Sequence, residues 1–250
     1  MNPEDTDCPI DFDPCIRDNI TCADFAQPKS HLSAIEAAQQ VIDLRPAELI
    51  ATPNEEFAKA LLNRGCALQR HAFAMTLNLV THQSETKNSP HHAYATQFVE
   101  NFSANDLFDS WHAAYPPGHP DFLSGTKEKL ISENIQPLLD RSLLGPNHRC
   151  SQALTHDGDV IAAIIVSMRE GEAPFGGPWV SELWCDPRFQ HQGIGRTLLS
   201  AAIANLTEDG YTSLGLAVSY GNPAKKLYES LGFTVVSESW TIKLPIVQAS

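Results

Sequence analysis

The alternation of hydrophobic and polar positions predicts both strands and helices in this chain. Residues 180–185 (VSELWC) form an apolar, β-prone run, which is typical of a buried strand. Asp186 and Pro187 end that strand, since proline has no N–H to donate to a neighbouring strand. Apolar residues at helical spacing follow over residues 196–206 (RTLLSAAIANL). A strand, a glycine-containing loop and a helix therefore follow one another directly.

The same periodicity divides most of the remaining chain into helices and strands. Turn and capping residues supply the boundaries: Ser103 and Asp106 form a capping box, and the segment His156-Asp157-Gly158-Asp159 is a hairpin turn signal. The other predicted elements are helices over residues 33–44 and 127–144, the latter broken at Pro137, and strands over residues 150–155, 160–168 and 212–219.

Residues 47–79 parallel residues 215–244 when Gly65 is aligned with Gly232. Both segments predict a short strand, a loop, one amphipathic helix, a glycine at the helix end and a long strand. Phe73, Met75 and Leu77 then take the positions of Trp240, Ile242 and Leu244, with the same alternation. Two interpretations remain open, an unrelated strand-helix-strand unit and the remnant of a second copy of one fold.

Composition narrows the classes of partner. The formal charge of −13 argues against nucleic acid or an anionic membrane as the main partner and suits a cationic amine. No apolar run approaches the roughly 20 residues of a membrane span, and residues 1–27 lack the pattern of a signal peptide, so we expect a cytoplasmic protein. Cys8, Cys15 and Cys22 are evenly spaced but form no CxxC pair; reduced thiols are favoured over a zinc site, and no metal is expected.

The loop after residue 185 has the chemistry of an anion site. Glycines let the backbone approach a ligand closely, and the free N–H groups and dipole at a helix start favour phosphate. Gln190, Gly193 and Gly195 resemble the Gln/Arg-x-x-Gly-x-Gly/Ala loop of the GCN5-related N-acetyltransferase (GNAT) family. Residues 222–233 resemble the family's second signature, Asn-x-x-Ala-x-x-x-Tyr-x-x-x-Gly-Phe: Ala224, Tyr228, Gly232 and Phe233 keep its spacing, and Asn222 stands one residue closer to the alanine than the signature has it. The resemblance covers about residues 96–245.

The resemblance implies an α/β fold with a mixed, mainly antiparallel sheet flanked by helices, which splays apart between residues 180–185 and 212–219. It also assigns the predicted domains. They are an acidic arm, extended or partly disordered, over residues 1–30; a partial, degenerate GNAT-like unit over 31–80; a linker containing His91 and His92 over 81–92; and an acetyl-CoA-binding GNAT domain over 93–250. The partial unit has too few strands to be stable alone, so we expect it to dock on the second domain or on another copy in a homodimer.

Acetyl-CoA is the cofactor that the resemblance implies, as a co-substrate. The family's cofactor contacts fall here on Leu183, Trp184, Cys185, Gln190, His191, Gln192, Gly193, Ile194, Gly195, Arg196 and Asn222. Most would act through backbone N–H groups, with Arg196 adding positive charge.

The resemblance gives Tyr228 the role of general acid toward the departing thiolate, and packing alone is the alternative. Glu182 is the best placed general base, with a structural ion pair or hydrogen bond as its alternative. By the same resemblance Tyr115 and His119, after the first helix of the second domain, are candidate acceptor contacts, and a packed proline-rich turn is the alternative.

Three functions are compatible with these residues. The favoured one is an acyltransferase that moves an acetyl group from acetyl-CoA to a primary amine of a small molecule or peptide by direct attack. A non-catalytic acyl-CoA-binding or interaction module is the second. The third is a tandem acetyltransferase of the mycothiol synthase kind.

Overall fold

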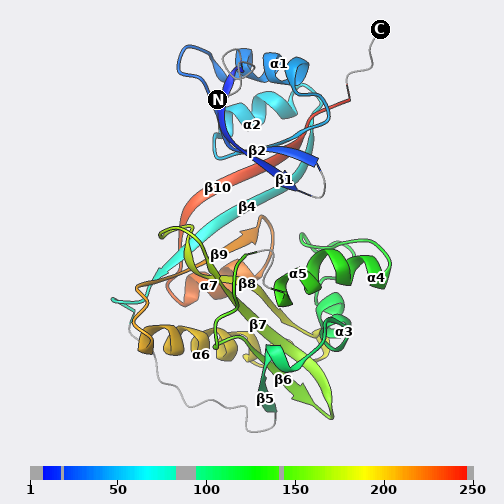
Figure 1. Ribbon diagram of the computed structural model, residues 1–250, viewed down its shortest axis with the longest axis vertical. Helices are drawn as coiled ribbons and strands as arrows, with labels where there is room; N and C mark the ends of the chain where they lie inside the picture. Colours follow the sequence, from blue (N-terminus) through cyan, green and yellow to red (C-terminus); the bar gives the residue numbers. More distant parts are fainter. Residues whose placement is uncertain (1–7, 18–19, 83–93, 141–143, 247–250) are drawn as a thin grey trace. The chain divides into compact units, whose positions relative to one another are not determined.

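The computed structural model describes residues 8–17, 20–82, 94–140 and 144–246, and these form two compact units (Figure 1). Unit 1 comprises Met1–Phe73 and Ser237–Ser250, and unit 2 comprises Ala74–Val236. The boundary falls inside two long strands, β4 (Ala67–Asn78) and β10 (Thr234–Lys243), so each strand belongs partly to both units. This division differs from the domain limits expected near residues 80 and 93, since residues 74–80 fall in unit 2 and residues 237–246 in unit 1.

Unit 1 is a sheet with the strand order β1-β2-β3-β10-β4, covered by two helices. β1 and β2 are antiparallel, β2 and β3 are parallel, and β3 and β10 are antiparallel. The helices bury apolar faces against one cluster that includes Ile10, Ile50, Phe57 and Ile242. Besides β4 and β10, unit 1 contains β1 (Ile10–Arg17), β2 (Ile20–Pro28), α1 (Ala34–Leu44), β3 (Leu49–Thr52) and α2 (Glu55–Leu62).

The extended or partly disordered arm expected at residues 1–30 is instead, in its described part, the β1–β2 hairpin. Pro14 of β1 pairs with Ala23 of β2. β1 is an edge strand, and edge strands tolerate proline because one side of the strand needs no N–H donor. Ile10, Ala23 and Ala26 are buried in the cluster under α1 and α2. Burial of these side chains holds the hairpin in the sheet despite its acidic composition.

The two units share one order of elements, and it extends further than the sequence indicated. β3–α2–β4 and β9 (Ser213–Ser219)–α7 (Ala224–Ser230)–β10 repeat as predicted, and Gly65 and Gly232 adopt positive φ of +81° and +92° after their helices. Each of these strand-helix-strand repeats follows an antiparallel hairpin and a helix, which are β1, β2 and α1 in unit 1 and β7, β8 and α6 in unit 2. The second hairpin strand then pairs in parallel with the first strand of the repeat, β2 with β3 and β8 with β9. The short strand of each repeat is the neighbour of the other repeat's long strand: β3 lies beside β10, and β9 lies beside β4.

Unit 2 has the strand order β10-β4-β9-β8-β7-β6-β5 and is mainly antiparallel, with β8 and β9 parallel. This confirms the predicted fold class. Its remaining elements are β5 (Ala95–Phe98), a 3₁₀ turn η2 (Val99–Asn101), α3 (Ala104–Ala114), α4 (Lys127–Leu130), a π-helical turn η3 (Ile131–Ile135), α5 (Gln136–Leu139), β6 (Gln152–His156), β7 (Asp159–Arg169), β8 (Gly177–Cys185), a 3₁₀ turn η4 (Pro187–Phe189) and α6 (Ile194–Glu208).

Helices cover both faces of the unit 2 sheet. Ile165 and Trp184 share an apolar cluster with α3, whereas Ile164, their neighbour on the opposite face, lies on the side where α6 contacts β7 (Figure 1). The capping box of Ser103 and Asp106 starts α3, as predicted. The helical segment after α3 ends at Leu139 rather than at residue 144, and it widens into the π-helical turn ahead of Pro137, whose missing N–H interrupts the regular hydrogen bonding.

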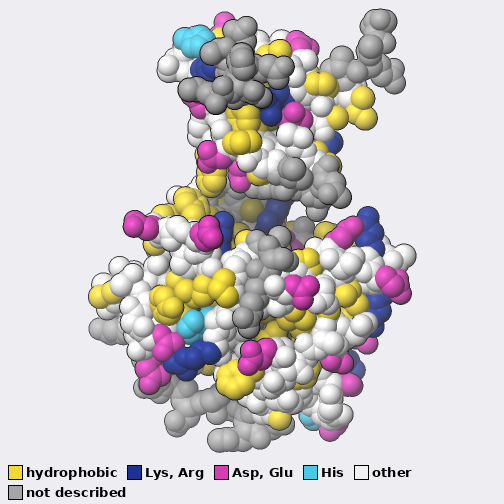
Figure 2. Space-filling model, in the orientation of Figure 1, with side chains coloured by type: hydrophobic (Ala, Val, Ile, Leu, Met, Phe, Trp, Pro, Cys, Tyr) yellow, Lys and Arg dark blue, Asp and Glu magenta, His cyan; other side chains and the backbone are white. Residues whose placement is uncertain are grey.

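Charged side chains of both signs are interspersed, among apolar ones, on the face of the molecule that Figure 2 shows. No helix in the described part of the chain has the length and apolar character needed to cross a bilayer. The linker predicted at residues 81–92, with His91 and His92, lies outside the described residues from position 83 onward.

Candidate active site

The predicted splay of the sheet lies between β8 and β9. The two strands pair only through Trp179 with Gly215 and Val180 with Leu216, and then their ladders separate. A β-bulge coincides with this point, since Ile165 pairs with Glu182 but the next residue of β7 pairs with Val180. After the bulge, β8 offers backbone groups toward β9 that no strand of the described chain pairs with, which is the arrangement that an extended ligand arm can use.

The loop after β8 exposes a row of backbone donors. Gly193 has a φ of +82°, which glycine adopts without strain, and it precedes α6 with no side-chain cap. Among the described residues, no backbone N–H from residue 191 to 196 donates to a backbone carbonyl; the first helical bond runs from Thr197 N–H to the Gly193 carbonyl. With no acidic residue in its first turn, this helix start can bind an anion.

Side chains around the loop hold it in place. Gln190 Nε2 donates to the Cys185 carbonyl at 3.0 Å, which fastens the loop to the end of β8. Tyr94 donates to Gln192 Oε1 at 3.0 Å. A Cβ on Gly195 would lie 3.6 Å from Leu227, so a small residue lets α6 and α7 pack closely. Arg196 donates to the Ser230 hydroxyl of α7, so its guanidinium lies toward that helix.

The equivalent helix start in unit 1 is closed. At α1, the Ser33 hydroxyl accepts from Glu36 N–H and the Glu36 carboxylate accepts from Ser33 N–H, which completes a capping box. Those donors are already used, and the Glu36 carboxylate places a negative charge where a phosphate would need positive potential. The helix start at Gly193 has neither feature.

Two tyrosines and two carboxylates gather on the α3 side of β8. Tyr115, which ends α3, donates to Glu182 Oε2 at 2.9 Å. Tyr228 of α7 is only 7% exposed, and burial, followed by the charges of Glu182 and Asp121, raises the pKa of its hydroxyl above the usual value. Burial and Glu182 likewise raise the pKa of Tyr115. Both phenols are therefore protonated near neutral pH and can donate protons or hydrogen bonds.

Asp121 is the member of this cluster that sequence reasoning missed. Its carboxylate accepts hydrogen bonds from the Ser219 hydroxyl and, at 2.8 Å, from Asn222 Nδ2. Asn222 Oδ1 also accepts from Ala224 N–H at 2.8 Å, while its amide is held by Asp121; the N-cap of α7 is Pro223. An aspartate in a proline-rich turn is common, and no local signal set this one apart.

The last three residues of β8 point to alternate faces. Trp184 Nε1 donates to the buried Ser110 hydroxyl of α3 at 2.9 Å, so this side chain anchors the helix on the sheet. Leu183 and Cys185 lie on the opposite face. Burial, reinforced by Asp186, raises the pKa of the Cys185 thiol to about 11, which keeps it protonated near neutral pH.

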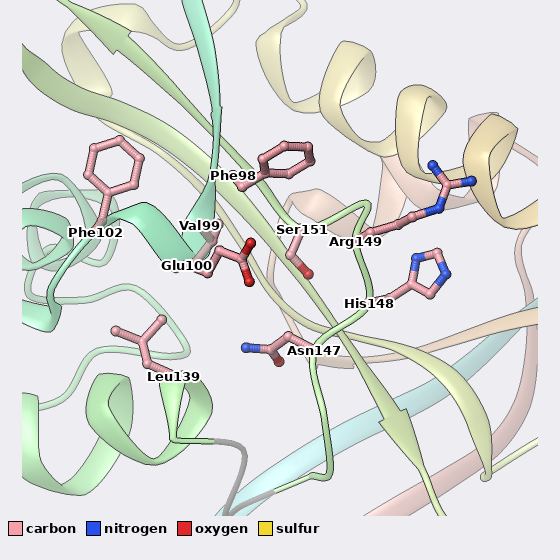
Figure 3. A pocket seen from close by; sticks show the side chains of 9 residues that line it. All are labelled: Phe98, Val99, Glu100, Phe102, Leu139, Asn147, His148, Arg149 and Ser151. Atoms are coloured by element: carbon pink, nitrogen blue, oxygen red, sulfur yellow. The ribbon is translucent and has the colours of Figure 1, made fainter.

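A pocket of about 310 Å³ lies elsewhere in unit 2, lined by residues such as Phe98, Glu100 and His148 (Figure 3). None of the predicted site residues lines it. Two of its polar side chains are engaged by the protein: His148 contacts Asp209, and Arg149 donates to the same carboxylate. This pocket is therefore separate from the predicted site residues.

The six cysteines are free thiols. Cys8 packs in the cluster under α1 and α2, whereas Cys15 and Cys22 pack with Leu49 on the other face of the unit 1 sheet. Cys15 and Cys22 are thus opposite one another in the β1–β2 pairing, and Cys8 lies apart from both.

Known proteins resemble this chain in sequence and in fold. An Escherichia coli (strain K12) [ribosomal protein bS18]-alanine N-acetyltransferase is 38% identical over 81 residues, which cover 32% of this chain and 51% of that protein. The chain thus spans about half the length of the curated relatives it matches. A GCN5-related N-acetyltransferase from Sphaerobacter thermophilus superposes with a TM-score of 0.63 at 12% identity, covering 95% of this chain and 78% of that one.

A tandem GNAT protein from the clavulanic acid biosynthesis pathway superposes with a TM-score of 0.56 at 12% identity, covering 92% of this chain and 76% of that one. Identities this low show the fold alone. The model of the acetyltransferase (GNAT) family matches residues 104–233, which contain the glycine loop and the tyrosine–carboxylate cluster. Because that match covers more than half of the chain, the protein belongs to the acetyltransferase (GNAT) family.

Proposed function

We propose that this protein is an acetyl-CoA-dependent N-acetyltransferase that acetylates a primary amine of a small molecule or peptide by direct attack. The observation that carries the proposal is the separation of β8 from β9 next to the uncapped start of α6. The edge of β8 that has separated from β9 suits an extended amide-containing arm, and the N–H groups of residues 191–196, which donate to no backbone carbonyl of the described chain, suit a pyrophosphate. Acetyl-CoA has both parts, and it supplies the acetyl group as a thioester.

Glu182 and Tyr228 divide the proton transfers. Glu182 takes the proton that an ammonium acceptor must lose before its nitrogen attacks, directly or through water, and Tyr115 holds the carboxylate by its 2.9 Å hydrogen bond. Tyr228 retains its proton because burial raises its pKa, so it protonates the departing thiolate. A backbone N–H near Cys185 polarises the thioester carbonyl, an interaction typically worth about 2.7–4 kcal/mol.

A single cofactor site per chain follows from the contrast between the two helix starts. α6 begins without a cap or an acidic residue, whereas Ser33 and Glu36 occupy the start of α1. Unit 1 thus acts as a structural copy, and acetyl-CoA binds to unit 2 alone. The bS18-alanine N-acetyltransferase relative acts, by its name, on the alanine of a ribosomal protein, which supports including peptides with an N-terminal alanine among the acceptors to test.

The test combines acetyl-CoA titration with turnover over a panel of polyamines, amino sugars and peptides with an N-terminal alanine. At least one amine should be acetylated, and Glu182→Gln should lower kcat/KM by roughly 10²-fold or more. Glu208→Gln, at the exposed end of α6, is the matched control and should retain full activity. Binding of acetyl-CoA without turnover of any amine would favour the non-catalytic module, and no binding would refute the cofactor site.

A further inference from the structure

The segment between α3 and α4, residues 115–122, crosses from one strand of the splay to the other. At its start Tyr115 donates to Glu182 of β8. At its end Asp121 accepts from Ser219, the last residue of β9. Because β8 and β9 no longer pair at these positions, the two contacts place this segment against both diverging strands.

Asp121, at the end of the segment, makes more contacts than Tyr115 makes with Glu182 at its start. One carboxylate oxygen accepts from the buried Ser219 hydroxyl and the other from Asn222 Nδ2. Asp121 N–H donates to His119 Nδ1 at 3.0 Å. Pro120 packs near the backbone of Gly221, with its Cγ 3.6 Å from where a Cβ on that glycine would lie. The end of the segment is thereby joined to the turn between β9 and α7.

The segment itself is compact. His119 N–H donates to the Pro116 carbonyl at 2.9 Å, and Phe122 N–H donates to the His119 carbonyl at 3.0 Å. The Tyr115 and His119 rings pack edge to face with centroids 5.1 Å apart. Two consecutive turns joined by ring packing move together, so the bonds at Asp121 determine where Tyr115 and His119 lie relative to β9.

We infer that Asp121 is a positioning residue of the acceptor site, which fastens residues 115–122 to Ser219 and Asn222 so that the amine meets Glu182 in productive geometry. The inference rests on the proposed function, since the acceptor is the amine of that reaction. Asp121 acts through its two partners rather than on the reacting atoms. Loss of its contacts should weaken productive binding of the amine more than binding of acetyl-CoA.

Two variants separate the hydrogen bonds of Asp121 from its charge. Asp121→Ala removes both and should raise the KM for the amine roughly tenfold or more, since hydrogen bonds to a charged group are being lost. Asp121→Asn keeps an oxygen to accept from Asn222 and gains an N–H that can donate to Ser219, so its KM should stay within about threefold of wild type. The Kd of acetyl-CoA should change less than the KM for the amine in Asp121→Ala, even though Asp121 also holds Asn222, a predicted cofactor contact.

Ser219→Ala removes one of the two bonds and covers the case in which Asp121→Ala fails to fold; its KM should rise by a few fold. The control is Asp109→Ala, an aspartate of α3 whose pairing with Lys127 is exposed to solvent. An unchanged amine KM in Asp121→Ala would overturn the inference. Equal losses in Asp121→Ala and Asp121→Asn would also overturn it, because the charge rather than the fastening would then matter.

Hydrogen exchange measured by mass spectrometry tests the fastening without turnover. Backbone amides of residues 116–122 should exchange faster in Asp121→Ala than in wild type, and at the wild-type rate in Asp121→Asn. A wild-type protein that acetylates no amine would refute the proposed function, while exchange would still decide the role of Asp121. Unchanged exchange in Asp121→Ala would overturn the fastening even in an active enzyme.

Discussion

Gly193 offers a direct test of the cofactor loop, because the structure supplies a matched control on the same helix. Gly193 precedes α6 with a φ of +82°, and Gly210 follows α6 with a φ of +84°. An added Cβ meets no atom within 4 Å at either position. Alanine at either site should therefore cost the same backbone strain, about 1–2 kcal/mol, and lower the Tm by a similar few degrees.

Acetyl-CoA affinity should distinguish the two glycines. Gly193 lies within the row of residues 191–196 whose N–H groups are proposed to bind the pyrophosphate, so a side chain there should crowd that ligand. Losing one hydrogen bond to a charged group costs about 1.5–3 kcal/mol, or roughly 10- to 150-fold in Kd. Gly193→Glu adds repulsion of the phosphates and should abolish measurable binding, whereas Gly210→Ala should bind as wild type does.

Isothermal titration calorimetry at fixed ionic strength measures both affinity and stoichiometry. Wild type should bind one acetyl-CoA per chain, since the start of α1 is closed by Ser33 and Glu36. Thermal melts of all variants report the backbone strain separately. Unchanged affinity in Gly193→Glu, or equal losses of affinity in Gly193→Ala and Gly210→Ala, would refute the assignment of the loop.

Two further predictions concern protonation. Tyr228→Phe should lower kcat on the order of 10²-fold while the Kd of acetyl-CoA stays unchanged, and a loss of affinity with unchanged kcat would indicate packing alone. Because the pKa of Tyr228 is raised, the phenol should keep its proton, and wild-type kcat should not decline through its deprotonation below about pH 10. Cys185, with a thiol pKa of about 11, should react with iodoacetamide at pH 8 far more slowly than a free cysteine, as followed by peptide mass spectrometry; rapid labelling would contradict its burial.

The features that the sequence predicted are those determined within a few residues. Gly193 and Gly232 adopt the positive φ that their loop and helix-end positions imply. Ser103 and Asp106 cap α3 from three residues apart, and Asp157-Gly158 turns a hairpin. In each case the chemistry of a short segment restricts the backbone, so no distant residue is needed to determine the outcome.

The β1–β2 hairpin shows where local reasoning fails. Its acidic residues and prolines are typical of an extended or disordered segment, yet Ile10 and Ala23 are buried under α1 and α2. That burial exists only once the two helices and the residues of β10 around Trp240 and Ile242 have assembled on the same sheet. The hairpin is therefore ordered by apolar contacts with residues far away in the sequence, including Trp240 and Ile242 near the C-terminus.

The site divides in the same way. The loop of residues 190–196 could be identified from its glycines and the helix that follows, because a phosphate-binding helix start is a local structure. The hydrogen bond from Tyr115 to Glu182 spans 67 residues, and the one from Asn222 to Asp121 spans 101. No periodicity or capping rule connects residues so far apart. Their meeting depends on the packing of α3 on β8 and on the divergence of β8 from β9, so only the tertiary structure decided which side chains surround the acceptor.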